Sequence, residues 1–171
     1  SSIAPRGTAI YLDKYSQYYL QAVPKDMWGQ ASLQKLTVTT PQGNHELLLQ
    51  TELGSNQINM VGLSAAGLVL FNLTWSDESG LEIKNNLPTK DIEAQVILAY
   101  YQLANWPMEN IQLGLKNLDL VNSPEDQQQR NFFRDNTRIF SMVHTPQYNL
   151  MTHYIDHYQI KIETLQQIKV D

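Results

Sequence analysis

The sequence predicts an α+β domain, in which a curved antiparallel sheet of about eight to eleven strands carries helices over its concave face. From residue 33 to residue 84, apolar and polar residues alternate with a period of two, and short polar turns separate the alternating runs. Such runs predict consecutive strands of an antiparallel meander. A later segment, residues 94–101, is apolar almost all round. A surface helix needs only one apolar stripe, so this segment predicts a helix that is covered on most sides.

The strands are expected between clear turn signals. The turns fall at Pro41–Asn44, Gly54–Asn56, Ala65–Gly67 and Asp77–Gly80, where Gly, Pro, Asn and Asp gather. Further strands are expected over residues 138–144, 151–156 and 158–165. Because so wide a sheet tends to curl, its concave face has to be filled by apolar side chains. The buried helix is the expected filler, and any space that it leaves would be a lipophilic pocket.

Four other segments complete the prediction. Residues 1–10 are interpreted as a tail, and apolar residues at helical spacing predict a short amphipathic helix over residues 11–20, ended by Pro24. The central helix is expected over residues 91–105, because Asp91 suits its start and Pro107 its end. A second short helix is expected over residues 108–115, and the polar stretch 117–136 is interpreted as a loop.

Composition narrows the classes of function. The 171 residues suit a single domain, 1–171, of which 42% are hydrophobic and 17% charged. The formal net charge is -5 and no Lys/Arg cluster stands out, which argues against nucleic acid as a partner. No stretch reaches the roughly 20 apolar residues of a membrane span. The absence of cysteine excludes disulfides and cysteine-ligated zinc.

The chemistry-bearing residues give little support for catalysis. His153 and His157 lie four apart, but in an alternating segment, where residues four apart are too far from each other to share a metal ion. Ser64, within Gly62–Gly67, lacks the spacing of a nucleophile elbow and falls between two strands. Glycines are scattered through turns, so no phosphate-binding loop is formed. We therefore expect no enzyme, no cofactor and no metal.

Three longer stretches carry a family resemblance. They are residues 47–75, which contain Val61-Gly62-Leu63-Ser64 before a glycine-containing hairpin, residues 98–107, which end in Asn105-Trp106-Pro107, and residues 157–165. Together they resemble the DUF3261 family of bacterial lipoproteins, over most of residues 33–165. That family in turn resembles the outer-membrane lipoprotein receptor LolB and its periplasmic carrier LolA.

The resemblance implies a LolA/LolB-like incomplete antiparallel β-barrel with helices as a lid over an apolar cavity. It further implies a lipid anchor on a cysteine just before Ser1, placement on the periplasmic face of the outer membrane, and exchange with a periplasmic carrier protein. In the receptor, a bulky apolar residue at the tip of one loop contacts the membrane. The corresponding loop here offers the small residues Ala65 and Ala66 at its tip, so membrane insertion through it is expected to be weak.

The leading hypothesis is therefore a non-enzymatic protein that binds or transfers a lipid, an acyl chain or a lipoprotein acyl group at the cell envelope. The expected cavity residues share the apolar face of the strands or the helix, with ordinary core packing as the alternative for each: Leu36, Val38, Leu47, Leu49, Ile58, Met60, Val69, Phe71, Leu73, Trp75, Val96, Tyr100 and Leu103.

Two alternatives remain open at this point. In the first, the helix fills the sheet completely and the protein is an interaction module of an envelope complex. Its contact patch would then be formed by the tyrosines of the first segment: Tyr11, Tyr15, Tyr18 and Tyr19. In the second, the protein processes an acyl thioester or a polyketide-like chain, with a histidine as base: His144, His153 or His157. A histidine in a pocket beside Ser64 or Asp156 would favour the second.

Overall fold

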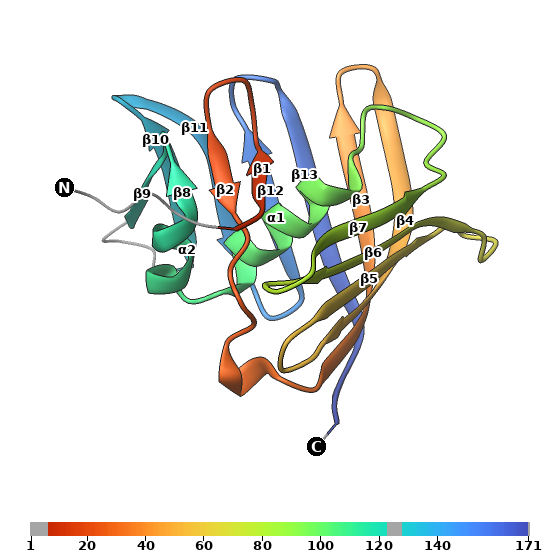
Figure 1. Ribbon diagram of the computed structural model, residues 1–171. Coiled ribbons are helices and arrows are strands. Elements are labelled where there is room, and N and C mark those ends of the chain that lie inside the picture. The colour runs from red at the N-terminus through yellow and green to blue at the C-terminus, as the bar shows by residue number, and fades with distance from the viewer. Residues whose placement is uncertain (1–6, 123–127, 171) are drawn as a thin grey trace.

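A ten-stranded antiparallel sheet dominates the computed structural model, which describes residues 7–122 and 128–170 (Figure 1). The strand order is β7-β6-β5-β4-β3-β13-β12-β11-β10-β9. Its strands are β3 (Gln30–Thr40), β4 (Gly43–Leu53), β5 (Ile58–Leu63), β6 (Val69–Ser76), β7 (Gly80–Asn85), β9 (Asp119–Asn122), β10 (Gln129–Arg134), β11 (Thr137–His144), β12 (Tyr148–His153) and β13 (Tyr158–Lys169). The sheet curves strongly but does not close, since β7 and β9 are edges. The expected open, curved antiparallel sheet is thus confirmed.

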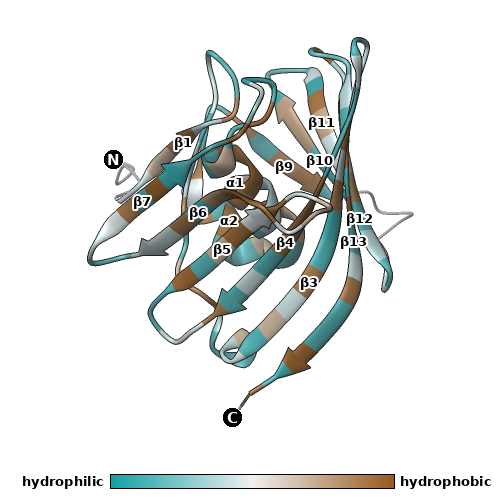
Figure 2. Cartoon of the chain, turned by 90° about the vertical axis from the view of Figure 1, so that its right-hand side faces the viewer, coloured by the Kyte–Doolittle hydropathy of each residue, from teal (hydrophilic) through white to brown (hydrophobic). Residues whose placement is uncertain are grey.

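Two meanders meet in the middle of this sheet. Strands β3 to β7 follow one another in space as in sequence, and so do β9 to β13. The long antiparallel pair of β13 with β3, which runs from Gln159 opposite Thr39 to Lys169 opposite Gln30, joins them. Buried and more exposed residues alternate along β5, β12 and the second half of β4, as a period of two requires. Figure 2 shows hydrophobic and hydrophilic residues following each other along the strands of the large sheet.

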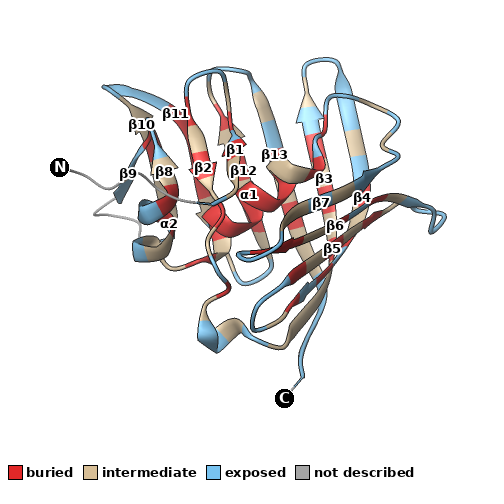
Figure 3. Ribbon diagram, in the orientation of Figure 1, coloured by how far each residue is buried: buried red, intermediate tan, exposed pale blue. Residues whose placement is uncertain are grey.

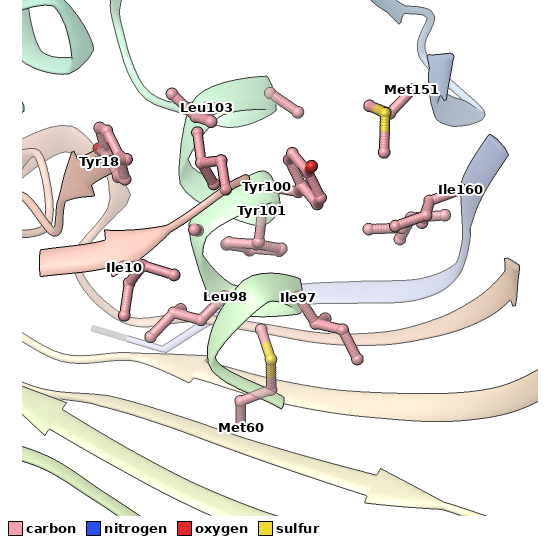
Figure 4. Close-up of a cluster of buried hydrophobic side chains, with 14 of the residues drawn as sticks. Ile10, Tyr18, Met60, Ile97, Leu98, Tyr100, Tyr101, Leu103, Met151 and Ile160 are labelled. Atoms are coloured by element: carbon pink, nitrogen blue, oxygen red, sulfur yellow. The ribbon is translucent and has the colours of Figure 1, made fainter. Parts of the chain in front are cut away.

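The helix α1 (Ala94–Asn105) crosses the concave face. It is buried along almost its whole length, and the buried residues of the sheet gather around it (Figure 3). Figure 4 shows the side chains of α1 meeting Ile10 and Tyr18 on one side and Met151 and Ile160 on another, with Met60 of the sheet nearby. The expected buried helix is confirmed, and it begins at Ala94 rather than at Asp91.

A small second sheet covers the other side of α1. It contains β1 (Ala9–Tyr11), β2 (Gln17–Tyr19) and β8 (Leu115–Lys116), in the order β1-β2-β8. The helix expected over residues 11–20 is therefore wrong. Asp13 explains why, because its carboxylate accepts the backbone N–H groups of Tyr15 and Ser16 and so closes a turn where a helix would have continued.

Buried hydrogen bonds fasten this hairpin to the C-terminal half of α1. Gln102 is fully buried, and its Oε1 accepts from Tyr18 Oη and from the Gln21 backbone N–H, both at 2.8 Å. The Gln21 carbonyl accepts from Gln102 Nε2 and from Trp106 Nε1, both at 3.1 Å. The small sheet, α1 and the large sheet consequently form three layers, with α1 as the middle one.

Other sequence predictions had mixed outcomes. The second helix is confirmed as α2 (Met108–Gly114), and the C-terminal strands are confirmed, with β13 running on to Lys169. The strand expected over 151–156 is shifted, since β12 is Tyr148–His153 and residues 154–156 lie in a turn. The loop over 117–136 is wrong where it can be checked, because β9 and β10 lie there and Phe132 is fully buried; residues 123–127 are outside the described residues. The tail of residues 1–10 is too long, since Ile10 belongs to β1 and is buried. A 3-10 turn, η1 (Lys25–Met27), leads into β3.

Gly62 explains part of the motif shared by β5 and β6. It lies opposite Phe71 in the register, and a Cβ atom built on it would collide with the Phe71 ring. The ring therefore packs directly over the backbone of the glycine, which only a residue without a side chain allows.

Within the described residues, no helix has the length and apolar character needed to cross a membrane.

Candidate functional site

An open pocket lies where the N-terminal end of α1 meets one end of the large sheet; we call it the mouth pocket. Its volume is about 670 Å³. Three loops surround it at the upper end of Figure 1: the β1–β2 turn, the β3–β4 turn and the β12–β13 turn. Its lining residues are Tyr11, Leu12, Asp13, Lys14, Val38, Thr40, Pro41, Gln42, Asp91, Ile92, Glu93, Val96, Ile97, Asp156, Tyr158 and Ile160.

The floor and the rim of the mouth pocket differ in chemistry. Buried aliphatic side chains form the floor, from β3, from the segment just before α1, from α1 itself and from β13: Val38, Ile92, Ile97 and Ile160. The rim contains four carboxylates and one ammonium group: Asp13, Asp91, Glu93, Asp156 and Lys14. A pocket with an apolar interior and a few polar groups at its edge is typical of a site for a small amphiphilic ligand.

The rim carboxylates are not equivalent. Asp13 pairs with Arg134 at 2.9 Å, and both side chains are mostly buried. Burial by itself would raise the pKa of Asp13, but hydrogen bonds from Arg134 and from two backbone N–H groups hold that pKa below its usual value. Asp91 lies 3.4 Å from His45 Nε2, and the Oε2 of Glu93 accepts a hydrogen bond from Gln95. Asp13 is thus a fixed structural anion, while the exposed carboxylates face solvent and the pocket.

Most of the residues expected to line a cavity are packed into the core. All thirteen except Val69 and Val96 are buried, because α1 fills the concave face that they form. Of the thirteen, Val38 and Val96 line the mouth pocket. Tyr100 borders a small cavity of about 10 Å³, which is too small for a ligand. Two of the thirteen thus lie at an opening, beside the N-terminal end of α1.

The hairpin between β5 and β6 projects from the sheet (Figure 1). Ala65 and Ala66 are exposed at its tip. After Gly67, the tip also presents a larger apolar side chain, because Leu68 is 68% exposed. Val69, which was expected to face a cavity, is 50% exposed in this hairpin. A register shift between Gly62 and Leu63 pairs Leu63 with Val69, so the regular alternation is interrupted just where Val69 lies.

Comparison with protein families identifies the chain. A family model described as "Protein of unknown function (DUF3261)" matches residues 31–166. The chain belongs to the DUF3261 family. The resemblance seen in the sequence is thereby confirmed. The match includes α1, the projecting hairpin and the large sheet, apart from the first residue of β3 and the last three residues of β13.

One solved structure shows a distant similarity. It is a domain from Vibrio parahaemolyticus, provisionally described as an outer membrane lipoprotein-sorting protein, and it is 7% identical to this DUF3261 chain. The alignment covers 83% of this chain and 86% of that domain, with a TM-score of 0.42. No curated protein matches the chain.

The histidines of this DUF3261 protein do not form a hydrolase triad in the described residues. Ser64 lies in the projecting hairpin, where its Oγ accepts from the Leu68 N–H, and no hydrogen bond joins it to a histidine. His153 does lie beside Asp156, as the enzyme hypothesis required, with Nε2 and Oδ2 3.8 Å apart. However, His153 Nδ1 accepts the Asp156 backbone N–H at 3.0 Å, so the carboxylate does not orient that nitrogen as a triad acid would.

The other histidines are separate from this pair. His144 bonds to Asn149 through Nδ1, and His157 lies in the turn between β12 and β13 with a positive φ of 56°. Residues 7–122 and 128–170 contain no group of three His, Cys, Asp or Glu residues placed to hold a metal ion.

Sequence reasoning missed most of the mouth pocket. Ile97 lies three residues before Tyr100 on α1, and Tyr158 and Ile160 share one face of β13, so helical and strand periodicity could have found them. Leu12 and Asp13 could not have been found, because they were assigned to a helix and lie in the β1–β2 turn. The tyrosine patch is also corrected: Tyr18 is fully buried, whereas Tyr11 and Tyr15 are each 64% exposed.

Proposed function

We propose that this DUF3261 protein is a non-enzymatic binder of a lipid or acyl chain, and that the mouth pocket is where the chain lies. The carrying observation is the apolar floor of this pocket, which opens to solvent beside the N-terminal end of α1. Its volume of about 670 Å³ falls within the range of small-molecule sites, roughly 300–1,000 Å³. A single acyl chain with its first polar group fits a pocket of this size and polarity.

Ligand detection is the direct test of this proposal. We expect native mass spectrometry of the purified protein, followed by organic extraction, to reveal a bound lipid or acyl chain. We also expect the emptied protein to take up a fluorescent fatty-acyl probe. An empty protein that takes up neither the acyl probe nor a neutral apolar dye would contradict the proposal.

A blocking substitution makes the test specific to the mouth pocket. Val96 is half-buried on α1 and lines the pocket, so Val96→Trp should fill it and abolish uptake of the probe. Val121→Trp is the matched control, because Val121 is 47% exposed on the edge strand β9. Loss of uptake in both variants, or in neither, would place the ligand elsewhere.

We further propose that the protein works at the periplasmic face of the outer membrane, held by a lipid anchor and supplied by a periplasmic carrier protein. The resemblance of its motifs to bacterial lipoproteins supports this placement. Fractionation of cells that express the full-length gene tests it. The protein should sediment with the outer membrane and be protected from protease in intact cells; recovery in the soluble cytosol would contradict the placement.

The projecting hairpin supports a transient membrane contact. Ala65, Ala66, Leu68 and Val69 are all exposed there, so apolar area is available at a protruding point. Leu68→Ser should reduce co-flotation with phospholipid vesicles, whereas Leu113→Ser should not, although Leu113 on α2 is equally exposed at 70%. Equal flotation of the two variants would exclude a special role for the hairpin.

One observation favours a second candidate, an interaction module of an envelope complex. Helix α1 covers most of the concave face. Eleven of the thirteen expected cavity residues are therefore buried, and only Val69 and Val96 are not. The contact surface would then include the exposed side chains of Tyr11, which lines the mouth pocket, and Tyr15, which lies in the β1–β2 turn. A protein that is purified without a bound lipid and does not bind acyl probes would support this candidate over the first.

A further inference from the structure

A second pocket lies at the end of the large sheet opposite the mouth pocket; we call it the polar pocket. Its volume is about 300 Å³. It is bordered by η1, by the C-terminal end of α1 and by the β11–β12 turn, at the lower end of Figure 1. Among the described residues that line it, none is Asp, Glu, Lys or Arg, whereas five such residues line the mouth pocket. The two pockets therefore suit different kinds of ligand.

The inward-facing side chains of β3 and β13 change from aliphatic to polar between the two pockets. Toward the mouth pocket this inward row is aliphatic: Leu36, Val38, Ile160 and Ile162. Toward the polar pocket it is uncharged and polar: Gln30, Ser32, Gln34, Thr164 and Gln167. The register places Gln34 opposite Thr164. A register shift after Thr164 then brings Gln167 opposite Ser32. Because core packing favours apolar residues at inward positions, this end of the row forms a polar wall.

A chain of hydrogen bonds fixes the polar groups on the helix side of the polar pocket. Asn105 Nδ2 donates to the Tyr101 carbonyl at 2.8 Å, and Asn149 Nδ2 donates to Asn105 Oδ1 at 3.1 Å. Asn149 Oδ1 is thus the acceptor in its bond with His144, which donates from Nδ1. In the neutral His144 ring, Nε2 is therefore an acceptor, and this side chain is exposed.

Several groups that line the polar pocket have hydrogen-bonding capacity left over. Among the described residues, the amides of Gln30 and Gln167 bond to no other protein group, and neither does His144 Nε2. Gln34 is 5% exposed, and its Nε2 donates to Thr164 Oγ1 at 3.1 Å while its Oε1 has no partner in the described part of the chain. That oxygen is closed off from solvent, so a ligand would be held by the accessible groups: Gln30, Gln167 and His144.

We propose that the polar pocket binds a neutral saccharide, a mono- or disaccharide unit. An amide group and a sugar hydroxyl each donate and accept, so Gln30 and Gln167 pair with hydroxyls, and His144 Nε2 accepts from another. Met27 and Pro146 supply apolar surface for the C–H face of the ring. The volume lies at the lower end of the range for small-molecule sites, about 300 Å³.

Other ligand classes fit the polar pocket less well. A charged ligand would lose its hydration without meeting an opposite charge, and an acyl chain would leave the polar wall without partners. This inference goes beyond the proposed function and does not depend on it, because it concerns a separate pocket.

An NMR titration of ¹⁵N-labelled protein tests the binding. D-glucose, D-galactose, D-mannose, N-acetyl-D-glucosamine, maltose and trehalose are added separately. We expect at least one of them to shift the side-chain amide resonances of Gln30 and Gln167. The matched charged analogues, D-glucuronate and D-glucosamine, should bind at least about fivefold more weakly than the neutral sugars.

Three outcomes of this titration would overturn the inference. They are the failure of every neutral sugar to shift the two amides, tighter binding of a charged analogue, and tighter binding of N-acetylalanine methylamide. The last result would assign the polar pocket to a peptide segment.

Two adjacent glutamines on β13 provide matched variants. Gln167 lines the polar pocket, whereas Gln166 is exposed and shares the outward face with its partner Leu33. Gln167→Leu should weaken sugar binding about fivefold, as the loss of one net hydrogen bond would give, and Gln30→Leu should act in the same way. Gln166→Leu should leave binding unchanged. Equal effects of the variants at 166 and 167 would overturn the inference.

The imidazole of His144 gives a spectroscopic readout. At about pH 8, above the usual histidine pKa, its ¹⁵N resonances should show Nδ1 protonated and Nε2 unprotonated in the free protein. A bound sugar should shift Nε2 in the direction of an accepted hydrogen bond. An unchanged Nε2 signal, with a sugar that shifts the Gln167 amide, would overturn this contact.

The mouth-pocket variant separates this inference from the proposed function. Val96→Trp should block uptake of the acyl probe and leave sugar binding intact. Loss of sugar binding in Val96→Trp would place the sugar at the mouth pocket and overturn the inference. Sugar binding by a protein that takes up no acyl probe would contradict the proposed function alone.

Discussion

The two halves of α1 have different tasks although they belong to one continuous helix. In its C-terminal half, Gln102 is fully buried and hydrogen-bonded, and Trp106, which follows the last residue of the helix, bonds to the same segment of chain. At its N-terminal end, Glu93 makes no side-chain capping hydrogen bond and Val96 is half-buried beside the mouth pocket. One end is held by buried hydrogen bonds, and the other end borders the mouth pocket.

This difference shows how a protein can keep an open pocket on a stable fold. The buried polar bonds at the C-terminal half fix the position and rotation of the helix, so the N-terminal half needs no complete packing of its own. The predictions below test whether stability resides in the first region and ligand access in the second.

The largest effect is expected at Gln102. Gln102→Leu leaves Tyr18 Oη and the Gln21 N–H without their buried acceptor, which should lower the free energy of unfolding by about 3 kcal/mol. Urea denaturation measures it. Gln112→Leu, at an exposed position on α2, is the control and should stay within about 0.5 kcal/mol of the wild type. Similar values for the two variants would show that the helix is not held in this way.

A smaller loss is expected at Gly62, in the filled part of the sheet. Gly62→Ala places a methyl group against the Phe71 ring and should cost about 2 kcal/mol. In the double variant with Phe71→Leu the smaller side chain should relieve the clash, so the two substitutions should be less than additive in denaturation experiments. Strict additivity would mean that the glycine is needed for another reason.

Stability should also depend on pH through His153, a buried histidine on β12 of the large sheet. Burial lowers the pKa of His153 below its usual value, although Asp156 and Asp13 act in the opposite direction; Arg134 and His157 add to the lowering. The unfolded chain therefore binds more protons than the folded one as the pH falls through the usual histidine range, near 6.5. Stability should decline from about pH 7 downward until the folded pKa is passed, by at most about 1.4 kcal/mol per pH unit for one proton.

His153→Phe should remove that part of the slope. Unfolding free energies between about pH 7 and pH 5 compare the variant with the wild type, and His157→Asn controls for an exposed histidine in the adjoining turn. The carboxylate of Asp13, whose pKa is lowered, contributes its stability above the usual aspartate pKa and loses it at more acidic pH, so it acts in a separate window. An unchanged slope in His153→Phe would show that the ring does not stay neutral on folding.

The smallest effect is expected at Val96. Val96→Ala removes two methyl groups from a half-buried wall of the mouth pocket and should cost no more than about 1 kcal/mol. Thermal denaturation should therefore change little, while a larger pocket should bind bulkier acyl probes. A loss comparable with that of Gln102→Leu would remove the distinction between the two ends of the helix.

The sequence predicted the large sheet and the central helix because both depend on local periodicity. Residues 36–75 alternate with a period of two, and residues 94–101 are apolar almost all round, so the meander and its filler follow from pattern alone. The hairpin of residues 9–19 was missed for a tertiary reason. Its tyrosines fit a helical stripe equally well, but the Asp13 turn and the contact of Tyr18 with Gln102 select the strands.

The candidate site was predicted less well than the fold. The pattern identifies which side chains face inward, and Leu49 and Phe71 do so, but it does not say where α1 stops covering them. The mouth pocket combines residues from β1–β2, α1 and β13, so only the packed structure shows them together. His153 was considered as a metal ligand or a base. Its ring instead stacks on Phe140 and Tyr158, and these contacts depend on the register of β11, β12 and β13.

The pairing of β13 with β3 has a consequence for how the chain is made. Strand β3, in the middle of the sheet, can complete its pairing only after β13 has been synthesised, since Gln30 pairs with Lys169. Contacts so distant in sequence make folding slow. As the chain leaves the ribosome, the long β3 edge of the first meander stays unpaired until residues 158–169 have emerged, and such an edge invites association with other chains. A product truncated before residue 158 would lack this closing strand altogether, so its β3 edge would stay open to aggregation.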